Sequence, residues 1–315
     1  MQAYIFRRLL LGVLILFVLS VAVFLVLRIA PGDPAVIRCG LSCTPERIDA
    51  IRDRLGLNDA YPVQYVNWLR DVVTGDLGDA AFSGKPVSES LLERLPVTVE
   101  LLVITLLITT VIGISFGIIS AVFRNSPLDF LVRISAVFGL AVPNFWVATL
   151  VLLIPLAIWG YAPPLGNAVG FFEDPLTNLR QFVPPAIVLG LASSAGIMRL
   201  TRSSLLEVMY TDYIRTARSK GLRESVVIGR HAIKNMLIPV VTVLGLQVAA
   251  LLGGTVIIEQ IFALPGVGLY FFQTLVTRDF VVVQSVTLYI GVVVVMMNLL
   301  VDISYAWLDP RIRYQ

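Results

Sequence analysis

Six long apolar runs dominate this sequence. An α-helix needs about 20 mostly apolar residues to cross roughly 30 Å of hydrocarbon, and six stretches approach or exceed that length. They predict an all-α, polytopic membrane protein with six transmembrane helices. The fourth run is short, and its two prolines are expected at the helix start, where proline is tolerated best. The predicted spans are Leu9–Ile29, Val97–Val122, Leu131–Trp159, Val183–Met198, Ile238–Ile261 and Val281–Leu308.

Composition agrees with a lipid-facing surface. The chain is 57% hydrophobic and 14% charged, whereas a soluble domain carries about 25% charged residues. Two cysteines and the single histidine, His231, exclude a metal-ligand cluster by the usual spacing rules. A P-loop is excluded because the candidate Gly84-Lys85 is followed by Pro86 instead of Ser or Thr. We therefore expect no cofactor, metal site or catalytic residue in this chain; any ATP must be bound elsewhere.

The first run is interpreted as a retained helix. Arg7 and Arg8 precede it, as in a secretion signal. However, the run is about 20 residues long, whereas a signal core has 7–15, and no small-x-small cleavage site follows.

Basic residues predict the orientation. Fourteen of them lie at the two ends, around Arg124 and Arg133, and in the 199–237 loop, whereas the loops 160–182 and 262–280 hold one each. The 30–96 segment has seven, but loops longer than about 60 residues are not counted. Because Lys and Arg accumulate on the cytoplasmic side, both termini are predicted to be cytoplasmic.

The 30–96 segment is expected to form a small cap outside the membrane. It carries ten acidic and seven basic residues and is too short to bury much core of its own. Cys39 and Cys43 lie in it. Because the compartment outside the membrane is oxidising, a disulfide between them is one interpretation; two free thiols are the other.

Several residues within the spans are candidates for lining a pore or gating it. A charge at mid-membrane costs at least about 2.5–3.5 kcal/mol, so Glu259 and Asp302 either pair near the interface or face a water-filled path. Pro143-Asn144 breaks the hydrogen-bond ladder of the third span. A packing kink and a kink that lines a pore both remain open there.

The cytoplasmic loop 199–239 contains the most informative pattern. Asp212 is a candidate N-cap and Gly221 a candidate stop for a short helix over Tyr213–Lys220. Its apolar residues Tyr213, Ile214 and Ala217 share one face, which is suited to contact a groove of another protein. The alternative is a basic loop that only determines topology and contacts lipid headgroups.

Several motifs together resemble one family over nearly the whole chain. The stretch Asp212-Tyr-Ile-Arg-Thr-Ala-Arg-Ser-Lys-Gly-Leu222 resembles the EAA loop of binding-protein-dependent ABC importer permeases, in the version of the dipeptide, oligopeptide and nickel branch. The segments beginning at Arg28, Arg230, Leu264, Asn298 and Leu308 resemble that branch as well, and the match is to its B-type pore subunit. Arg215 replaces the acid of the general motif, and the spacing from Gly221 to Pro239 is longer than in the broad family.

The resemblance implies a type I ABC importer permease fold in the bacterial inner membrane. The expected division is a first helix at 1–29, an extracytoplasmic cap at 30–96 and a five-helix core at 97–315. The residues expected to couple the chain to an ATPase follow as a set: Asp212, Tyr213, Ile214, Arg215, Thr216, Ala217, Arg218, Lys220, Gly221 and Leu222.

The resemblance also implies partners. They are a second permease, two ABC ATPases that bind ATP and Mg, and an extracytoplasmic peptide-binding protein, together with membrane lipid and no nucleic acid. The expected cargo is a di- or oligopeptide, and nickel, haem or an opine-like ligand of the same branch is the alternative. A secondary transporter would predict inverted repeats and ionisable residues at the membrane midplane, and neither pattern is evident.

Overall fold

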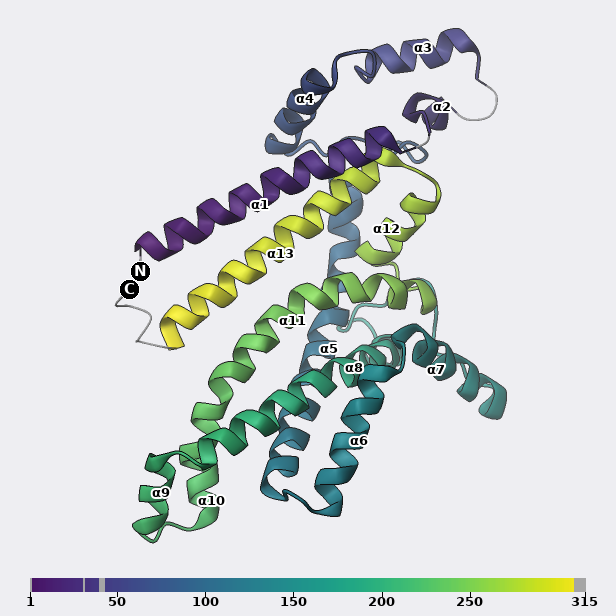
Figure 1. Cartoon of the computed structure of the whole chain (residues 1–315). Helices are drawn as coiled ribbons and strands as arrows, with labels where there is room; N and C mark the ends of the chain where they lie inside the picture. Colours follow the sequence, from purple (N-terminus) through teal and green to yellow (C-terminus); the bar gives the residue numbers. More distant parts are fainter. Residues whose placement is uncertain (1, 31, 40–42, 309–315) are drawn as a thin grey trace. The chain divides into compact units, whose positions relative to one another are not determined.

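The computed structural model describes residues 2–30, 32–39 and 43–308. In these ranges the chain is helical and has no named strand, as the apolar runs predicted. The helices, labelled as in Figure 1, are α1 Gln2–Ile29, α2 Pro34–Cys39, α3 Pro45–Arg54, α4 Tyr61–Val73, α5 Val87–Val122, α6 Pro127–Ala141, α7 Asn144–Trp159, α8 Pro175–Met209, α9 Asp212–Ser219, α10 Glu224–Val226, the π-helix η1 Val227–Ala232, α11 Ile233–Ile261, α12 Val267–Val276 and α13 Phe280–Leu308.

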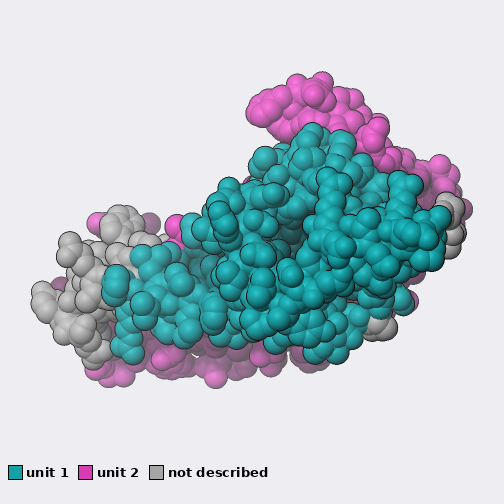
Figure 2. Space-filling model, turned by 90° about the horizontal axis from the view of Figure 1, so that it is seen from above, with its two compact units in different colours: residues 1–98, 265–299 teal, residues 99–264, 300–315 magenta. Residues whose placement is uncertain are grey.

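The chain forms two compact units (Figure 2). Unit 1 contains residues 1–98 and 265–299, and unit 2 contains 99–264 and 300–315. This division differs from the three consecutive segments expected from the sequence. The reason is that α12 and most of α13 pack with the N-terminal residues, although they are far from them along the chain.

In unit 1, α13 packs along α1 through glycines. Gly12 lies against Val295, and Gly291 lies against Leu19, so the backbones approach closely at both positions. Polar contacts join the segment after α4 to the start of α13. Asp279, which directly precedes α13, accepts a 2.7 Å hydrogen bond from the Ala81 amide, and Ser285 donates a 2.8 Å hydrogen bond to the carbonyl oxygen of Leu77. The cap therefore obtains its support from the last helices instead of from a core of its own.

The cap has a helical outer part. It contains α3 and α4, and Tyr65 and Trp68 of α4 pack against Phe24 of α1. A disulfide joins Cys39 and Cys43, with their Cα atoms 5.7 Å apart, a usual separation for such a bond.

In unit 2, α8 packs against α5 where small residues permit close approach. Gly113 and Gly117 of α5 face Ile197 and Thr201, and Gly190 of α8 faces Ile108. Lipid provides no hydrophobic force between helices, so this close packing is a main source of their association.

Two predicted spans differ in the structure. The third is broken into α6 and α7, which are bent by 99°. The break occurs because Pro143 precedes α7 with extended backbone, and proline disfavours a helical conformation in the residue before it. The structure therefore has five long apolar helices in its described residues, or six spans if the bent pair is one.

The fourth span is longer than expected. Its helix, α8, starts at Pro175, where the side chain of Asp174 accepts hydrogen bonds from the amides of Leu176 and Thr177. Pro184 and Pro185 lie inside α8 and not at its start. The sequence expectation failed because the apolar run marks only the part of the helix suited to hydrocarbon, whereas the cap at Asp174 determines where the helix begins.

Candidate functional site: the α9 loop and the broken helix

The predicted short helix of the 199–239 loop is present as α9. It covers Asp212–Ser219, so Asp212 lies in the first turn and the N-cap position belongs to Thr211. Thr211 makes no side-chain cap; its hydroxyl donates to the carbonyl oxygen of Val208 at 2.6 Å. Gly221 has φ +75°, a left-handed conformation that favours glycine. This backbone conformation explains why the helix stops near Gly221, as predicted. The assignment of Asp212 as N-cap was wrong.

The apolar face of α9 is covered by its own chain. Ile214 is 0% and Ala217 7% exposed, and both belong to a core cluster that includes Val227, Ala232 and Met236. Tyr213 is half-exposed, and its hydroxyl accepts a 2.7 Å hydrogen bond from Asn235 Nδ2. The expectation that this stripe contacts another protein is therefore corrected for Ile214 and Ala217, because η1 and α11 fold back over them.

The opposite face of α9 is open to the surroundings. Asp212 and Arg215 have side chains that are 94% and 77% exposed and lie 3.3 Å apart, a surface pair that contributes only about 0–1 kcal/mol to stability. Thr216, Lys220, Gly221 and Leu222 are exposed as well. Any partner of this loop would therefore meet a polar, basic surface.

Arg218 has a partner inside the loop. Its guanidinium donates to the Glu224 carboxylate at 2.6 and 3.1 Å. The hydrogen bond to Glu224 raises the pKa of Arg218 above its ordinary value. The pair joins α9 to α10 across the turn at Gly221.

Two further features of this loop carried no sequence signal. Residues Val227–Ala232 form a π-helix that contains His231, and π-helical turns are frequent at functional sites. A pocket of about 280 Å³ lies beside α9, and its lining includes Arg124, Met209, Tyr210 and Arg218. Both features depend on how distant helices meet, which periodicity does not reveal.

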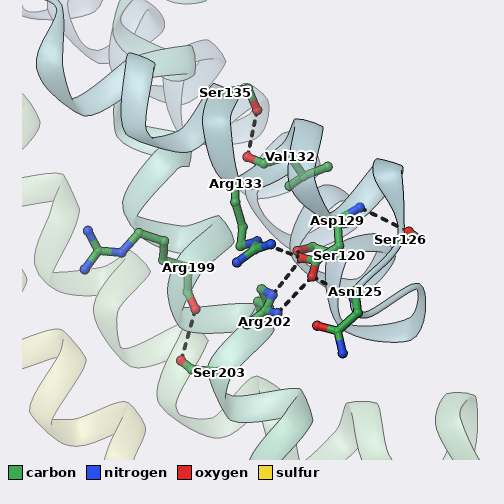
Figure 3. Close-up of polar contacts among 10 residues, drawn as sticks. All are labelled: Ser120, Asn125, Ser126, Asp129, Val132, Arg133, Ser135, Arg199, Arg202 and Ser203. Carbon is green, nitrogen blue, oxygen red and sulfur yellow. Dashed lines mark hydrogen bonds and ion pairs between the residues drawn. The ribbon is translucent and has the colours of Figure 1, made fainter.

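A buried carboxylate organises the helices that precede this loop. Asp129 of α6 is 0% exposed and accepts two hydrogen bonds from Arg202 of α8, from Nε at 2.9 Å and Nη2 at 3.1 Å. Ser120 donates at 2.6 Å, and Arg133 lies 3.4 Å away (Figure 3). The cluster joins α5, α6 and α8 at one point. Sequence reasoning missed it, because Asp129 and Arg202 are 73 positions apart.

The candidates for pore lining are distributed over different places. Pro143 and Asn144 line a pocket of about 440 Å³ at the break between α6 and α7, together with Ser193, Gly196 and Gln247. Glu259 of α11 is 0% exposed and is not among the residues of that pocket. The side chain of Asp302 is not among those that the structure describes.

Within the described ranges, no three His, Cys, Asp or Glu side chains gather in a way that could hold a metal ion.

Comparison with protein families gives two matches that together span nearly the whole chain. Residues 113–314 match the family described as binding-protein-dependent transport system inner membrane component. Residues 1–102 match the N-terminal part of such membrane components.

Three full-length relatives are similar to this chain. A protein of Brucella abortus named as a permease of peptide transport systems is 41% identical over 314 residues, covering 100% of both chains. The dipeptide transport system permease protein of Alkalihalophilus pseudofirmus is 38% identical, and the oligopeptide transport system permease protein of Bacillus subtilis is 37% identical, each with 100% of both chains covered.

Two solved structures share the fold. A methionine ABC transporter in inward-facing conformations aligns with a TM-score of 0.54 and 16% identity, over 70% of this chain and 96% of that one. An amino acid ABC transporter aligns with a TM-score of 0.53 and 16% identity, over 70% and 94%. The fold is therefore that of type I ABC importer permeases.

Proposed function

This chain belongs to the family of inner membrane components of binding-protein-dependent transport systems, and from that premise we propose that it is one of two pore subunits of a peptide importer. Function as a permease subunit, expected from the sequence, is confirmed by the family and by full-length relatives. The names of those relatives support dipeptides or oligopeptides as cargo.

The proposed assembly has five parts. A second permease completes the pore, two ATPase subunits bind ATP and Mg, and an extracytoplasmic binding protein delivers the peptide. The chain itself lacks a P-loop, so the energy must come from the ATPase partners. Alternating access then requires helices that move as rigid bodies and no chemistry within the pore.

The proposed orientation places α9 in the cytoplasm and the 30–96 cap outside, where it docks the binding protein. The asymmetry of Lys and Arg supports this orientation. The disulfide in the cap supports it as well, since disulfides persist in oxidising compartments.

The proposed coupling element is the α9 loop, and the observation that carries it is the division of its two faces. Ile214 and Ala217 attach α9 to α8, η1 and α11, so a push on α9 is transmitted to the long helices. The exposed residues Arg215, Thr216 and Lys220 are accessible to an ATPase. The pocket at Pro143 and Asn144 is the proposed part of the translocation path, because a broken helix exposes polar backbone that lipid does not tolerate but a cavity does.

The test compares the two faces of α9 in the complete importer reconstituted in liposomes. We expect Arg215→Glu to reduce uptake of a labelled dipeptide at least about tenfold, since reversing one charge at a desolvated contact costs 1.4 kcal/mol or more. It should also reduce ATPase stimulation by the binding protein, while leaving the amount and melting temperature of this chain unchanged.

Two further variants complete the experiment. Ala217→Asp should reduce the melting temperature as well as uptake, because the residue is buried against its own chain. Arg180→Glu, at an exposed residue outside the cap and the α9 loop, is the matched charge reversal and should leave ATPase coupling unchanged. Normal uptake and normal ATPase stimulation in Arg215→Glu would refute the assignment of this face.

A further inference from the structure

A pocket in unit 1 takes no part in the coupling or the translocation proposed above. It has a volume of about 190 Å³ and lies where the end of α1 meets α4, the turn before α4 and the start of α13. None of its residues belongs to the α9 loop or to the pocket at Pro143. Its polar lining comes from Arg28, Asp59, Gln64, Asn67, Asp71 and Gln284.

Arg28 provides a cationic side to this pocket. Its Nε donates a 2.9 Å hydrogen bond to Gln64 Oε1, and its guanidinium lies 4.8 Å from the centre of the Phe24 ring. Gln64 is itself held by hydrogen bonds from its Nε2 to the carbonyl oxygens of Leu57 and Asp59. Arg28 is thus positioned without a carboxylate in ion-pair range among the described residues.

Gln284 adds an unsatisfied donor. The residue is 5% exposed and lines the pocket, and its Nε2 has no hydrogen-bond partner among the described residues. A buried donor that is left unpaired destabilises the folded protein. Such groups are normally paired with protein, water or ligand, so Nε2 indicates that an acceptor enters the pocket from outside the chain.

The same pocket carries acidic and apolar groups. The lining includes Asp71, which is exposed, and Asp59, and their carboxylates can accept hydrogen bonds from an ammonium group. Trp68 and Phe280 add aromatic surface. One small pocket therefore contains groups suited to a negative charge, to a positive charge and to an apolar side chain.

We propose that this pocket binds a small zwitterion, with its anionic group on Arg28 and Gln284 and its ammonium group on Asp71. The volume admits a free amino acid or a dipeptide. The headgroup of phosphatidylethanolamine presents the same chemistry, a phosphate beside a primary ammonium, so the ligand comes either from solution or from the lipid. In either case none of the residues of the site lines the pocket at Pro143 and Asn144.

The test uses the full-length chain, purified in detergent and stripped of lipid. Radiolabelled dialanine is the soluble probe, and its acetylated, amidated analogue, which lacks both charges, is the competitor. For the lipid source, the chain is placed in nanodiscs that contain phosphatidylethanolamine or phosphatidylcholine, and bound lipid is measured by native mass spectrometry.

Each of two variants removes the contact to one charged group of the ligand. We expect Gln284→Leu and Asp71→Asn to weaken binding about tenfold or more, because each removes a hydrogen bond to a charged group of the ligand. Gln284→Leu should not lower the melting temperature of the empty protein, since it removes an unpaired buried amide. Gln273→Leu, at an exposed glutamine of α12, is the matched control and should leave binding unchanged.

A ligand from solution and a lipid headgroup are expected to give different results in this experiment. Saturable dialanine binding that the uncharged analogue does not displace, and that both variants lose, assigns the site to solutes. Retention of phosphatidylethanolamine over phosphatidylcholine, lost in both variants and without dialanine binding, assigns it to lipid. If neither probe binds, or if binding is unaffected by both variants, the pocket contains only water and the proposal is overturned.

Discussion

At the scale of single residues, burial separates side chains that look alike in the sequence. Arg133 and Arg202 both approach Asp129 (Figure 3). Arg202 makes two short hydrogen bonds and is 22% exposed, whereas Arg133 lies 3.4 Å away and is 51% exposed. Only the first should be important for stability, because a fully buried carboxylate needs a partner that is also shielded from solvent.

The corresponding prediction compares two substitutions of the same type. Arg202→Gln should destabilise the protein by about 3–5 kcal/mol, the usual cost of leaving a buried charge unpaired. Arg133→Gln should cost less than about 1 kcal/mol, as expected for an exposed pair. Thermal unfolding of the purified protein in detergent measures both. Equal losses would show that Arg202 does not neutralise Asp129.

The N-cap of α8 leads to a prediction about pH. The Asp174 carboxylate accepts a 2.6 Å hydrogen bond from the Thr177 hydroxyl, and this bond, followed by those from backbone amides, lowers the pKa of Asp174. A lowered pKa in the folded state means that the stabilisation is complete above the unfolded pKa of about 3.9. It is lost as the pH falls through the folded value.

The expected result is a fall in melting temperature below about pH 4 that is smaller in Asp174→Asn than in the parent protein. The asparagine can still cap the helix, so the two proteins should have similar melting temperatures near neutral pH. An identical pH dependence in both would contradict the assigned role of Asp174.

At the scale of helices, close packing depends on glycines on one face of α5. A Cβ atom at Gly117 would lie 2.9 Å from the carbonyl oxygen of Met198 in α8, and a backbone atom cannot move aside as a flexible side chain can. By contrast, a Cβ atom at Gly196 of α8 would meet nothing within 4 Å. The two glycines therefore differ in their surroundings: Gly117 permits the close approach of α8, whereas Gly196 has open space beside it.

We predict that Gly117→Ala destabilises the protein by about 1–3 kcal/mol, the usual cost of overpacking. Gly196→Ala should be neutral or slightly stabilising, since alanine favours a helix by up to about 1 kcal/mol over glycine. The melting temperatures of the two variants test this prediction. A tolerated alanine at position 117 would mean that α5 and α8 are less closely packed than described.

At the scale of the whole molecule, the distribution of charge among loops determines how the chain is placed in the membrane. The basic 199–237 loop and both ends are predicted on one side, and the acidic cap on the other. The proposed roles of α9 and of the cap both depend on this orientation. It can be tested without any partner subunit.

The test labels single cysteines in intact cells, after Cys39 and Cys43 are replaced by serine. Lys220→Cys should react with a membrane-impermeant maleimide only after the cells are opened, whereas Ser83→Cys in the cap should react in intact cells once the reagent reaches the outer face of the membrane. Both positions are exposed, so access to the side chain does not limit the reaction. The reverse pattern would invert the proposed orientation.

The sequence by itself determined that the chain spans a membrane as a helical bundle, the approximate position of most spans, and the presence of α9. These features are local: a long apolar run or a glycine stop at Gly221 acts within a few residues. Only the tertiary structure decided which face of α9 is covered, that the third span is broken by 99°, and that Asp129 meets Arg202. The cover over α9 and the contact of Asp129 with Arg202 depend on residues far apart along the chain, and no local pattern contains that information. Pro143 indicates the break in the third span, but not its angle.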